Sequence, residues 1–274
     1  MTKPNDYVLG QSERAARRLE IQDLHFADVS EELLDELALK PDERVVEFGC
    51  GAGSFSKRIL RRLGKGGVLV GVDSGEGLLK QAESSLADLG PARFEPVLAD
   101  IVKLGDWLDG ADVVTARTML HHIPMVEVVL GQLRAALKPG TRVGFLEPDF
   151  RTPLGRLAYV ERAGRPELAA LRVWAFAINQ LYLATRISPD CGATLARTLM
   201  MAGYRNVREH WSETRSGLET IENMLMFYDE VRERLHTLGI MTIAEIDEQQ
   251  RLLRALTGDS LPPAWGIYRV TCEV

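Results

Sequence analysis

Cysteine is scarce in this chain of 274 residues. The three cysteines, Cys50, Cys191 and Cys272, lie far apart and are odd in number. Such spacing gives neither a disulfide framework nor the paired ligands of a zinc site. We therefore expect a protein of the reduced, cytoplasmic compartment that holds no metal. Cys50 stands in a glycine-rich turn, where a small residue is a better interpretation than a nucleophile.

An excess of positive charge and long apolar runs are missing too. The chain has 33 Lys and Arg against 39 Asp and Glu, which gives a net charge of −6 and a pI near 5.5. An acidic chain is poorly suited to a phosphate backbone or to an anionic membrane surface. No apolar run reaches the length of a membrane span, and the opening MTKPNDYVLG lacks an apolar signal core. We expect neither nucleic acid nor membrane as a partner.

What the sequence does contain is a regular alternation of apolar strands and helices. Short buried strands are predicted at 43–48, 66–73, 93–100, 111–117 and 142–149. Helices are predicted between them, at 53–63, 76–88 and 125–137. Strands that alternate with helices of this length indicate βαβ units. The expected fold is therefore α/β, with a doubly wound and mostly parallel sheet.

Helical segments interrupt this alternation and divide the chain into four predicted parts. Residues 1–40 are expected to form an N-terminal helical cap, and 41–150 the α/β core. Residues 151–188, rich in Leu, Ala, Arg and aromatics, are expected to form a helical lid. The remainder of the core, 189–274, contains a helix at 191–203, a strand near 204–211, a helical insertion near 217–257 and a β-rich end at 264–274.

The stretch VVEFGCGAGSFSKRIL, residues 45–60, places three glycines between a strand and a helix. Glycines there let a ligand approach bare backbone, and the helix start adds free N–H groups. A dinucleotide would favour G-x-G-x-x-G, whereas the spacing here is G-x-G-x-G with Glu47 two residues ahead. A carboxylate disfavours a pyrophosphate and favours a ligand with an ammonium group, such as S-adenosylmethionine. A nicotinamide enzyme is the weaker alternative.

At this point the chain resembles the class I S-adenosylmethionine-dependent methyltransferases, well over 40–150 and loosely over 190–211. Their first motif is an acidic residue, any residue, then G-x-G-x-G, as in VVEFGCGAG. The resemblance implies a Rossmann-like seven-stranded sheet with helical lid insertions. It also implies that Asp73 binds the ribose hydroxyls and that Asp100 receives the adenine amino group, beside the N–H of Ile101. The segment RTMLHHIP, 117–124, matches the family in part.

The resemblance gives a set of expected cofactor contacts. From the glycine-rich motif they are Glu47, Gly49, Cys50, Gly51 and Gly53. From later segments they are Asp73, Ser74, Asp100, Ile101 and Arg117. The opening DYVLGQSERAARRLEIQ is similar to that of some small-molecule methyltransferases of secondary metabolism, which adds Tyr7, Arg18 and Gln22. An Arg or Gln on an amphipathic helix also fits a solvated face, and that alternative stays open.

The acceptor is expected to be a small molecule. The chain has no N/D/S-P-P-aromatic signature after the fourth strand, no cysteine placed for pyrimidine chemistry and no basic arm for RNA. Long helical insertions suit an enclosed substrate, which we expect to be biosynthetic, with O- or N-methylation favoured. A methyltransferase of RNA or protein is one alternative, and a cofactor-binding protein without turnover is another. Helical insertions often dimerise, so a homodimer stays open.

Methyl transfer needs alignment and, for some acceptors, removal of a proton. Ligands bind at the carboxyl ends of parallel strands, so a base is sought after the fourth and fifth strands. The candidates are His121, His122, Glu147 and Asp149. A histidine titrates near neutral pH and can take a hydroxyl proton. Both histidines could instead pack against or cap the helix at 125–137.

Overall fold

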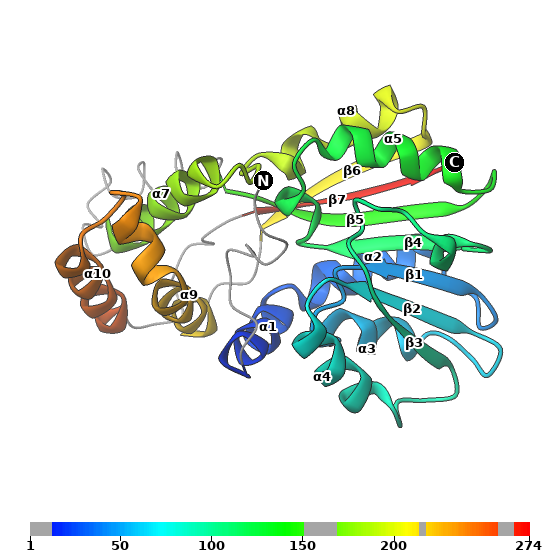
Figure 1. The fold of residues 1–274 in the computed structure, drawn as a ribbon, viewed down its shortest axis with the longest axis horizontal. Helices are drawn as coiled ribbons and strands as arrows, with labels where there is room; N and C mark the ends of the chain where they lie inside the picture. The colour runs from blue at the N-terminus through cyan, green and yellow to red at the C-terminus, as the bar shows by residue number, and fades with distance from the viewer. Residues whose placement is uncertain (1–12, 151–168, 214–217, 257–265) are drawn as a thin grey trace.

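A computed structural model describes residues 13–150, 169–213, 218–256 and 266–274. Its seven strands form one sheet in the order β3-β2-β1-β4-β5-β7-β6 (Figure 1). The strands are β1 (Arg44–Phe48), β2 (Val68–Asp73), β3 (Arg93–Leu98), β4 (Val113–Arg117), β5 (Arg142–Asp149), β6 (Arg205–Glu213) and β7 (Gly266–Glu273). The first five in chain order pair in parallel, and β7 is antiparallel to both β5 and β6. The predicted fold class is confirmed.

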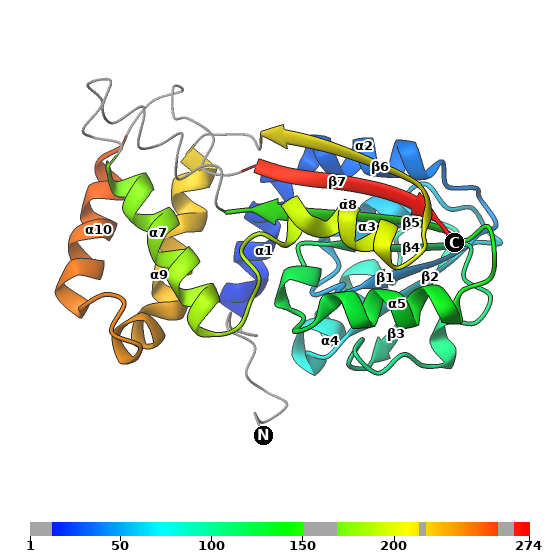
Figure 2. The same ribbon diagram turned by 90° about the horizontal axis from the view of Figure 1, so that it is seen from above.

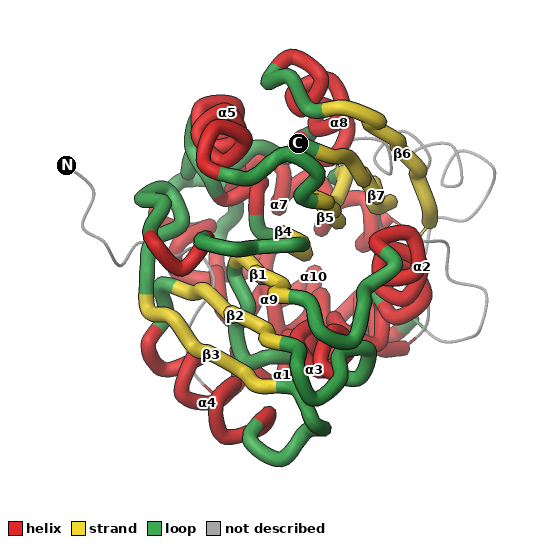
Figure 3. The backbone as a smooth tube through the Cα atoms, turned by 90° about the vertical axis from the view of Figure 1, so that its right-hand side faces the viewer, coloured by secondary structure: helices red, strands yellow, loops and turns green. Residues whose placement is uncertain are grey.

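Helices cover both faces of the sheet. On one face lie α2 (Ala27–Leu37), α3 (Ser54–Leu60) and α4 (Glu76–Leu86), and on the other α5 (Val126–Ala136) and α8 (Cys191–Met201). Figure 3, which looks along the strands, shows the sheet between these two layers. The fold is therefore doubly wound, as the alternation of strands and helices predicted.

The sheet separates two hydrophobic cores, one on each face. Adjacent residues of the central strands contribute to opposite cores. Val45 faces one core and Val46 the other, because successive side chains in a strand point to opposite faces. The same split holds on the neighbouring strands, where Leu69 and Val113 lie level with Val45. All of these side chains are fully buried. Burial on both faces explains why these strands read as continuous apolar runs in the sequence.

A second group of helices stands beyond the end of the sheet. It comprises α1 (Glu13–His25), α7 (Ala169–Ala184), α9 (Leu218–Thr237) and α10 (Ile243–Ala255), and we call it the helical lobe. Figures 1 and 2 show α7, α9 and α10 grouped apart from the sheet, with α1 between them and the strands. Inside the lobe, Trp174 of α7 packs edge-on against Phe227 of α9 at 5.6 Å. No described helix is both long and apolar enough to span a bilayer.

Candidate active site

The glycine-rich turn after β1 has a backbone that only glycine adopts without strain. Gly49, Gly51 and Gly53 have φ of 66°, 54° and 88°, all in the left-handed region. A Cβ added at Gly49 would lie 2.4 Å from Cγ of Met119. The N–H of Gly49 donates to the carbonyl of Val72 at 2.8 Å, which ties the turn to the end of β2. The turn then enters α3 and leaves its backbone open to a ligand.

Asp73, the last residue of β2, braces this turn. Its Oδ2 accepts the N–H of Gly51 and its Oδ1 the N–H of Gly75, each at 2.8 Å. Burial raises the pKa of Asp73, and these backbone hydrogen bonds oppose that rise. A carboxylate oxygen has a second lone pair, so Asp73 can hold the turn and still accept from a ligand hydroxyl.

Glu47 lies beneath the turn as a buried carboxyl, only 2% exposed. The hydroxyl of Ser56 on α3 donates to its Oε2 at 2.6 Å. Burial raises the pKa of Glu47 to about 7, although Ser56 and Arg117 act in the opposite direction. A cation bound nearby would favour the ionised form of this residue.

Four further predicted residues, from the turn and from the segments after β2 and β3, lie around the same cavity, whereas Gly53 does not line it. Cys50 is buried, and burial raises the pKa of its thiol well above the usual value, so it is no nucleophile. Ser74 and Asp100 are exposed, whereas Ile101 is buried. Asp100 accepts the N–H of Val102 at 3.0 Å. All four line the cavity, as the resemblance led us to expect.

Arg117, at the end of β4, points to the first helix. Its Nη1 donates to Oδ1 of Asp23 at 2.6 Å and to the hydroxyl of Ser30 at 3.1 Å. The guanidinium carbon lies 5.0 Å from the ring centre of Phe55, a cation–π distance. Asp23 also pairs with Arg58 at 2.7 Å. Arg117 thus lines the cavity while fastening α1 to the sheet.

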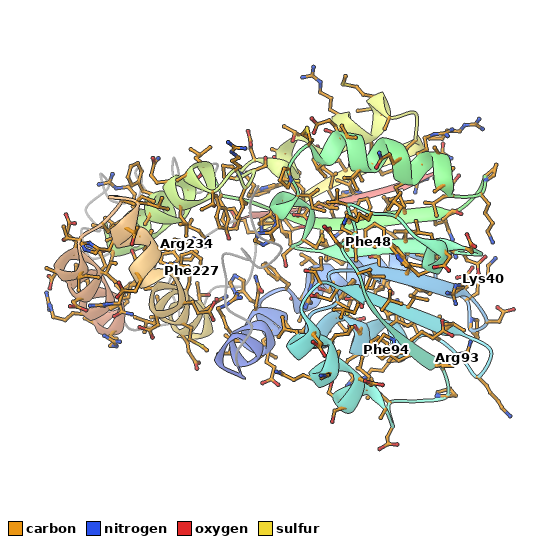
Figure 4. The ribbon with its side chains drawn as sticks, viewed as in Figure 1. Lys40, Phe48, Arg93, Phe94, Phe227 and Arg234 are labelled. Carbon is orange, nitrogen blue, oxygen red and sulfur yellow. The ribbon has the colours of Figure 1, made fainter. Side chains whose placement is uncertain are left out.

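The cavity has a volume of about 940 Å³. That is near the upper end of the roughly 300–1,000 Å³ found for ligand pockets, so it has room for a cofactor and an acceptor together. Its floor is the glycine-rich turn and the ends of the parallel strands, and its far wall is the helical lobe. Figure 4 marks two of the lobe residues that line it, Phe227 and Arg234 of α9.

Three helices each give one stripe of side chains to this cavity. The stripes are Arg18 and Gln22 on α1 with Phe26 directly after it, Trp174, Ile178 and Tyr182 on α7, and Asn223, Phe227 and Arg234 on α9. Spacings of four and seven residues keep side chains on one face of a helix. Arg18 and Gln22 were predicted to lie here, whereas Tyr7 lies outside the described residues. The stripes on α7 and α9 were not predicted. The spacing of their side chains by four and seven residues was the feature of the sequence that could have indicated them.

His121 and Glu147 form a buried pair beside the cavity. Nδ1 of His121 lies 2.7 Å from Oε2 of Glu147, which is 0% exposed. Glu147 also accepts the backbone N–H groups of Met119, Leu120 and His121 at 2.8, 2.7 and 3.2 Å. With so many donors directed at it, Glu147 acts as an acceptor, so we assign the proton to Nδ1 of His121. The other ring nitrogen, Nε2, then carries a lone pair that can accept a hydrogen bond.

The other two predicted catalytic residues are placed differently. His122 lines the cavity with its ring centre 4.0 Å from that of His121. Burial lowers the pKa of His122 well below its usual value, and the positive charge of Arg18 acts in the same sense. Asp149 is buried at the end of β5 and does not line the cavity. Among the described residues, no cluster of His, Cys, Asp and Glu could hold a metal.

These residues fit S-adenosylmethionine better than a phosphate-bearing cofactor. Glu47, Asp73 and Asp100 surround the glycine-rich turn with carboxylates, which complement a cation and repel a phosphate. The bare backbone at Gly49 and Gly51 allows close approach.

Comparison with known proteins shows which family the chain belongs to. Residues 46–143 match the family described as methyltransferase domain. The chain is 30% identical over 203 residues to trans-aconitate 2-methyltransferase of Methylobacterium nodulans, which covers 69% of this chain and 75% of that enzyme. It is 30% identical over 129 residues to nocamycin O-methyltransferase of Saccharothrix syringae, covering 45% and 44%. For several other relatives the chain spans only 34% to 59% of their length.

A solved structure shares the fold. Phosphoethanolamine N-methyltransferase 2 of Haemonchus contortus, in complex with S-adenosyl-L-methionine, superposes with a TM-score of 0.56 at 12% identity. The match covers 100% of this chain and 60% of that one.

Proposed function

Because the chain belongs to the class I S-adenosylmethionine-dependent methyltransferases, we propose that it transfers a methyl group from this cofactor to an oxygen of a small organic acceptor. The observation that carries the choice of oxygen is the pair of His121 and Glu147. A hydroxyl loses its proton on methylation, and a neutral imidazole at the cavity wall can take that proton.

The cofactor residues have separate roles in this proposal. Gly49 and Gly51 offer their backbone to the cofactor, and Asp73 binds its ribose hydroxyls. Glu47 lies where a cationic end of the cofactor is favoured, and Asp100 and Ile101 lie beside the adenine. Arg18 and Gln22 cover the cofactor from α1.

The cofactor supplies a methyl group on a sulfonium, which is already a good leaving group. With the cofactor bound, the carbon–sulfur bond would break as the acceptor oxygen bonds to the methyl carbon, and its electron pair would remain on sulfur. His121 Nε2 takes the proton of the hydroxyl. Glu147 is a positioning residue, since it fixes the ring and tautomer of His121 and stabilises the imidazolium that forms. The lobe aligns the acceptor and excludes water.

Two relatives support a small acceptor, and the name of one of them specifies methylation on oxygen. One is a trans-aconitate 2-methyltransferase and the other an O-methyltransferase of nocamycin. The enclosed cavity, with walls from α1, α7 and α9, suits such a molecule better than a polymer. A homodimer and a cytoplasmic location remain expectations from the sequence.

The test uses S-adenosylmethionine carrying a labelled methyl group and a panel of phenols, hydroxy acids and carboxylic acids. We expect label in an ether or ester product, and a loss of about 10²- to 10⁴-fold in kcat for His121→Gln. Binding of S-adenosylhomocysteine should be unchanged in this variant. Glu147→Gln should shift the pH profile of kcat as well as lower it. If His121→Gln keeps full activity on a hydroxyl acceptor, the assignment of the base is wrong.

A further inference from the structure

The two ends of the cavity differ in charge. At the glycine-rich turn the charged side chains are carboxylates, whereas four arginines contribute to the walls: Arg18, Arg117, Arg186 and Arg234. Arg18 is neutralised by Glu230 at 3.0 Å, and Arg117 by Asp23 at 2.6 Å. Within the described part of the chain, Arg186 and Arg234 make no ion pair or side-chain hydrogen bond. Two guanidinium groups thus line a cavity without a partner among the residues that the structure describes.

Arg186 stands at a position where the backbone favours glycine. It follows the end of α7 with φ of 61°, and the next residue, Ile187, donates its N–H to the carbonyl of Tyr182 at 2.8 Å. This is the left-handed end of a helix, a place that glycine commonly takes. A side chain with a Cβ is less stable there than glycine. The backbone conformation therefore does not explain an arginine at this position. The side chain of Arg186 is exposed and lies at the rim of the cavity.

Arg234 comes to the same cavity from α9. It lies seven residues after Phe227 on the same helix face, and Figure 4 labels both. Figure 2 shows α7 and α9 running in the same direction, so the ends that carry Arg186 and Arg234 lie on one side of the lobe. Glu230, one turn before Arg234, is engaged by Arg18. The charge of Arg234 is thus left for a ligand.

Apolar and aromatic side chains line the same cavity as these arginines. Trp174, Ile178 and Phe227 line the cavity and pack into one hydrophobic cluster. A ligand held here would place an apolar body on these side chains and an anionic group on the guanidinium groups. Arginine binds a carboxylate through two parallel hydrogen bonds, which gives direction as well as affinity.

We propose that Arg186 and Arg234 bind a carboxylate of the acceptor, so that the substrate class is an organic acid with an apolar body. This inference rests on the proposed methyl transfer, because it concerns the acceptor half of the same cavity. The carboxylate anchors the molecule at the lobe, and the oxygen to be methylated lies toward His121.

Binding in the complex with S-adenosylhomocysteine tests the proposal without turnover. The probes are matched pairs of small acids and their neutral amides, such as 4-hydroxybenzoate and 4-hydroxybenzamide, followed by thermal shift and calorimetry. We expect acids to stabilise the protein and to bind at least tenfold more tightly than their amides. Arg186→Gly and Arg234→Gln should each remove most of that preference. Arg197→Gln, an exposed arginine on α8 away from the cavity, is the matched control and should keep it.

Thermal stability distinguishes a ligand-binding role of Arg186 from a purely structural role of the same side chain. Arg186→Gly relieves the left-handed backbone, so its melting temperature should stay equal or rise while the preference for acids falls. If no acid stabilises the protein, or if acids and amides bind alike, the proposal is wrong. Methylation of neutral phenols as efficiently as of acids would overturn this inference and leave the proposed methyl transfer standing.

Discussion

Arg18 of α1 and Glu230 of α9 form a buried ion pair across 212 residues of sequence. Nε of Arg18 lies 3.0 Å from Oε2 and 3.1 Å from Oε1 of Glu230, and the two side chains are 4% and 6% exposed. Arg18 also lines the cavity. The pair therefore joins the first helix to the lobe at the wall of the site.

Breaking this pair should destabilise the protein strongly. Glu230→Gln leaves the guanidinium of Arg18 buried without its countercharge, which costs about 3–5 kcal/mol for buried pairs. Urea unfolding of the variant measures the loss. The double variant Arg18→Met/Glu230→Leu should recover most of it, because apolar side chains can replace a buried pair. Lys80→Met, which breaks the exposed pair with Glu76, is the control and should have no measurable effect. Equal losses in all three variants would contradict the prediction.

Asp73→Asn should weaken cofactor binding by about 1–3 kcal/mol, since charge-assisted hydrogen bonds contribute on that order. The amide also places an NH₂ against the N–H of Gly51 or of Gly75, which loosens the turn. Calorimetry with S-adenosylhomocysteine measures the change. Glu76→Gln, three residues later and exposed, should bind as the parent does. Unchanged affinity of Asp73→Asn for S-adenosylhomocysteine would mean that cofactor binding at the turn does not depend on this carboxylate.

Glu47 should make the protein less stable as pH rises from about 4.5 to about 7. In that range the unfolded carboxyl has lost its proton, while burial raises the pKa to about 7 and keeps the native one protonated. The unfolded state then binds fewer protons, so the free energy of unfolding falls with pH, by at most about 1.4 kcal/mol per unit.

Glu47→Gln isolates this effect, because glutamine stays neutral and can still accept the hydrogen bond from Ser56. Buried His25 acts in the opposite sense, since desolvation lowers its pKa to about 4 and favours the native state as pH rises toward 6.5. The comparison is therefore the difference between variant and parent, measured by urea unfolding at several pH values. Parallel curves would show that Glu47 ionises normally.

The central strands of the sheet could be predicted from sequence because they are buried on both faces. The strand predicted at 142–149 has those bounds as β5, and the one predicted at 43–48 is β1 at 44–48. The helical stretch near 217–257 is two helices, α9 and α10. The boundary between these two helices is marked in the sequence, since Thr242 and Glu245 form a capping box at the start of α10.

The candidate site also has one part that the sequence predicted and one part that it did not. The glycine-rich turn and Asp73 are adjacent to strand ends, so a local pattern was enough to place them at the cavity. Arg234 gave no such signal, because a lone arginine on an amphipathic helix also fits a solvated face. Arg186 follows the end of α7, where no helical periodicity indicates which way a side chain faces. Glu230 became a partner of Arg18 only through the packing of α1 on α9. Contacts of that kind depend on tertiary structure and have no local pattern.

The position of β7 has a consequence for the order of assembly. This strand is the last in chain order, yet it lies between β5 and β6 and pairs with both. During synthesis on the ribosome, β6 emerges before it has a neighbour to pair with, and β5 keeps an open edge. Open edges recruit other chains. The nascent protein is therefore exposed to aggregation until residues 266–273 leave the ribosome, and insertion of that strand is the step a chaperone would protect.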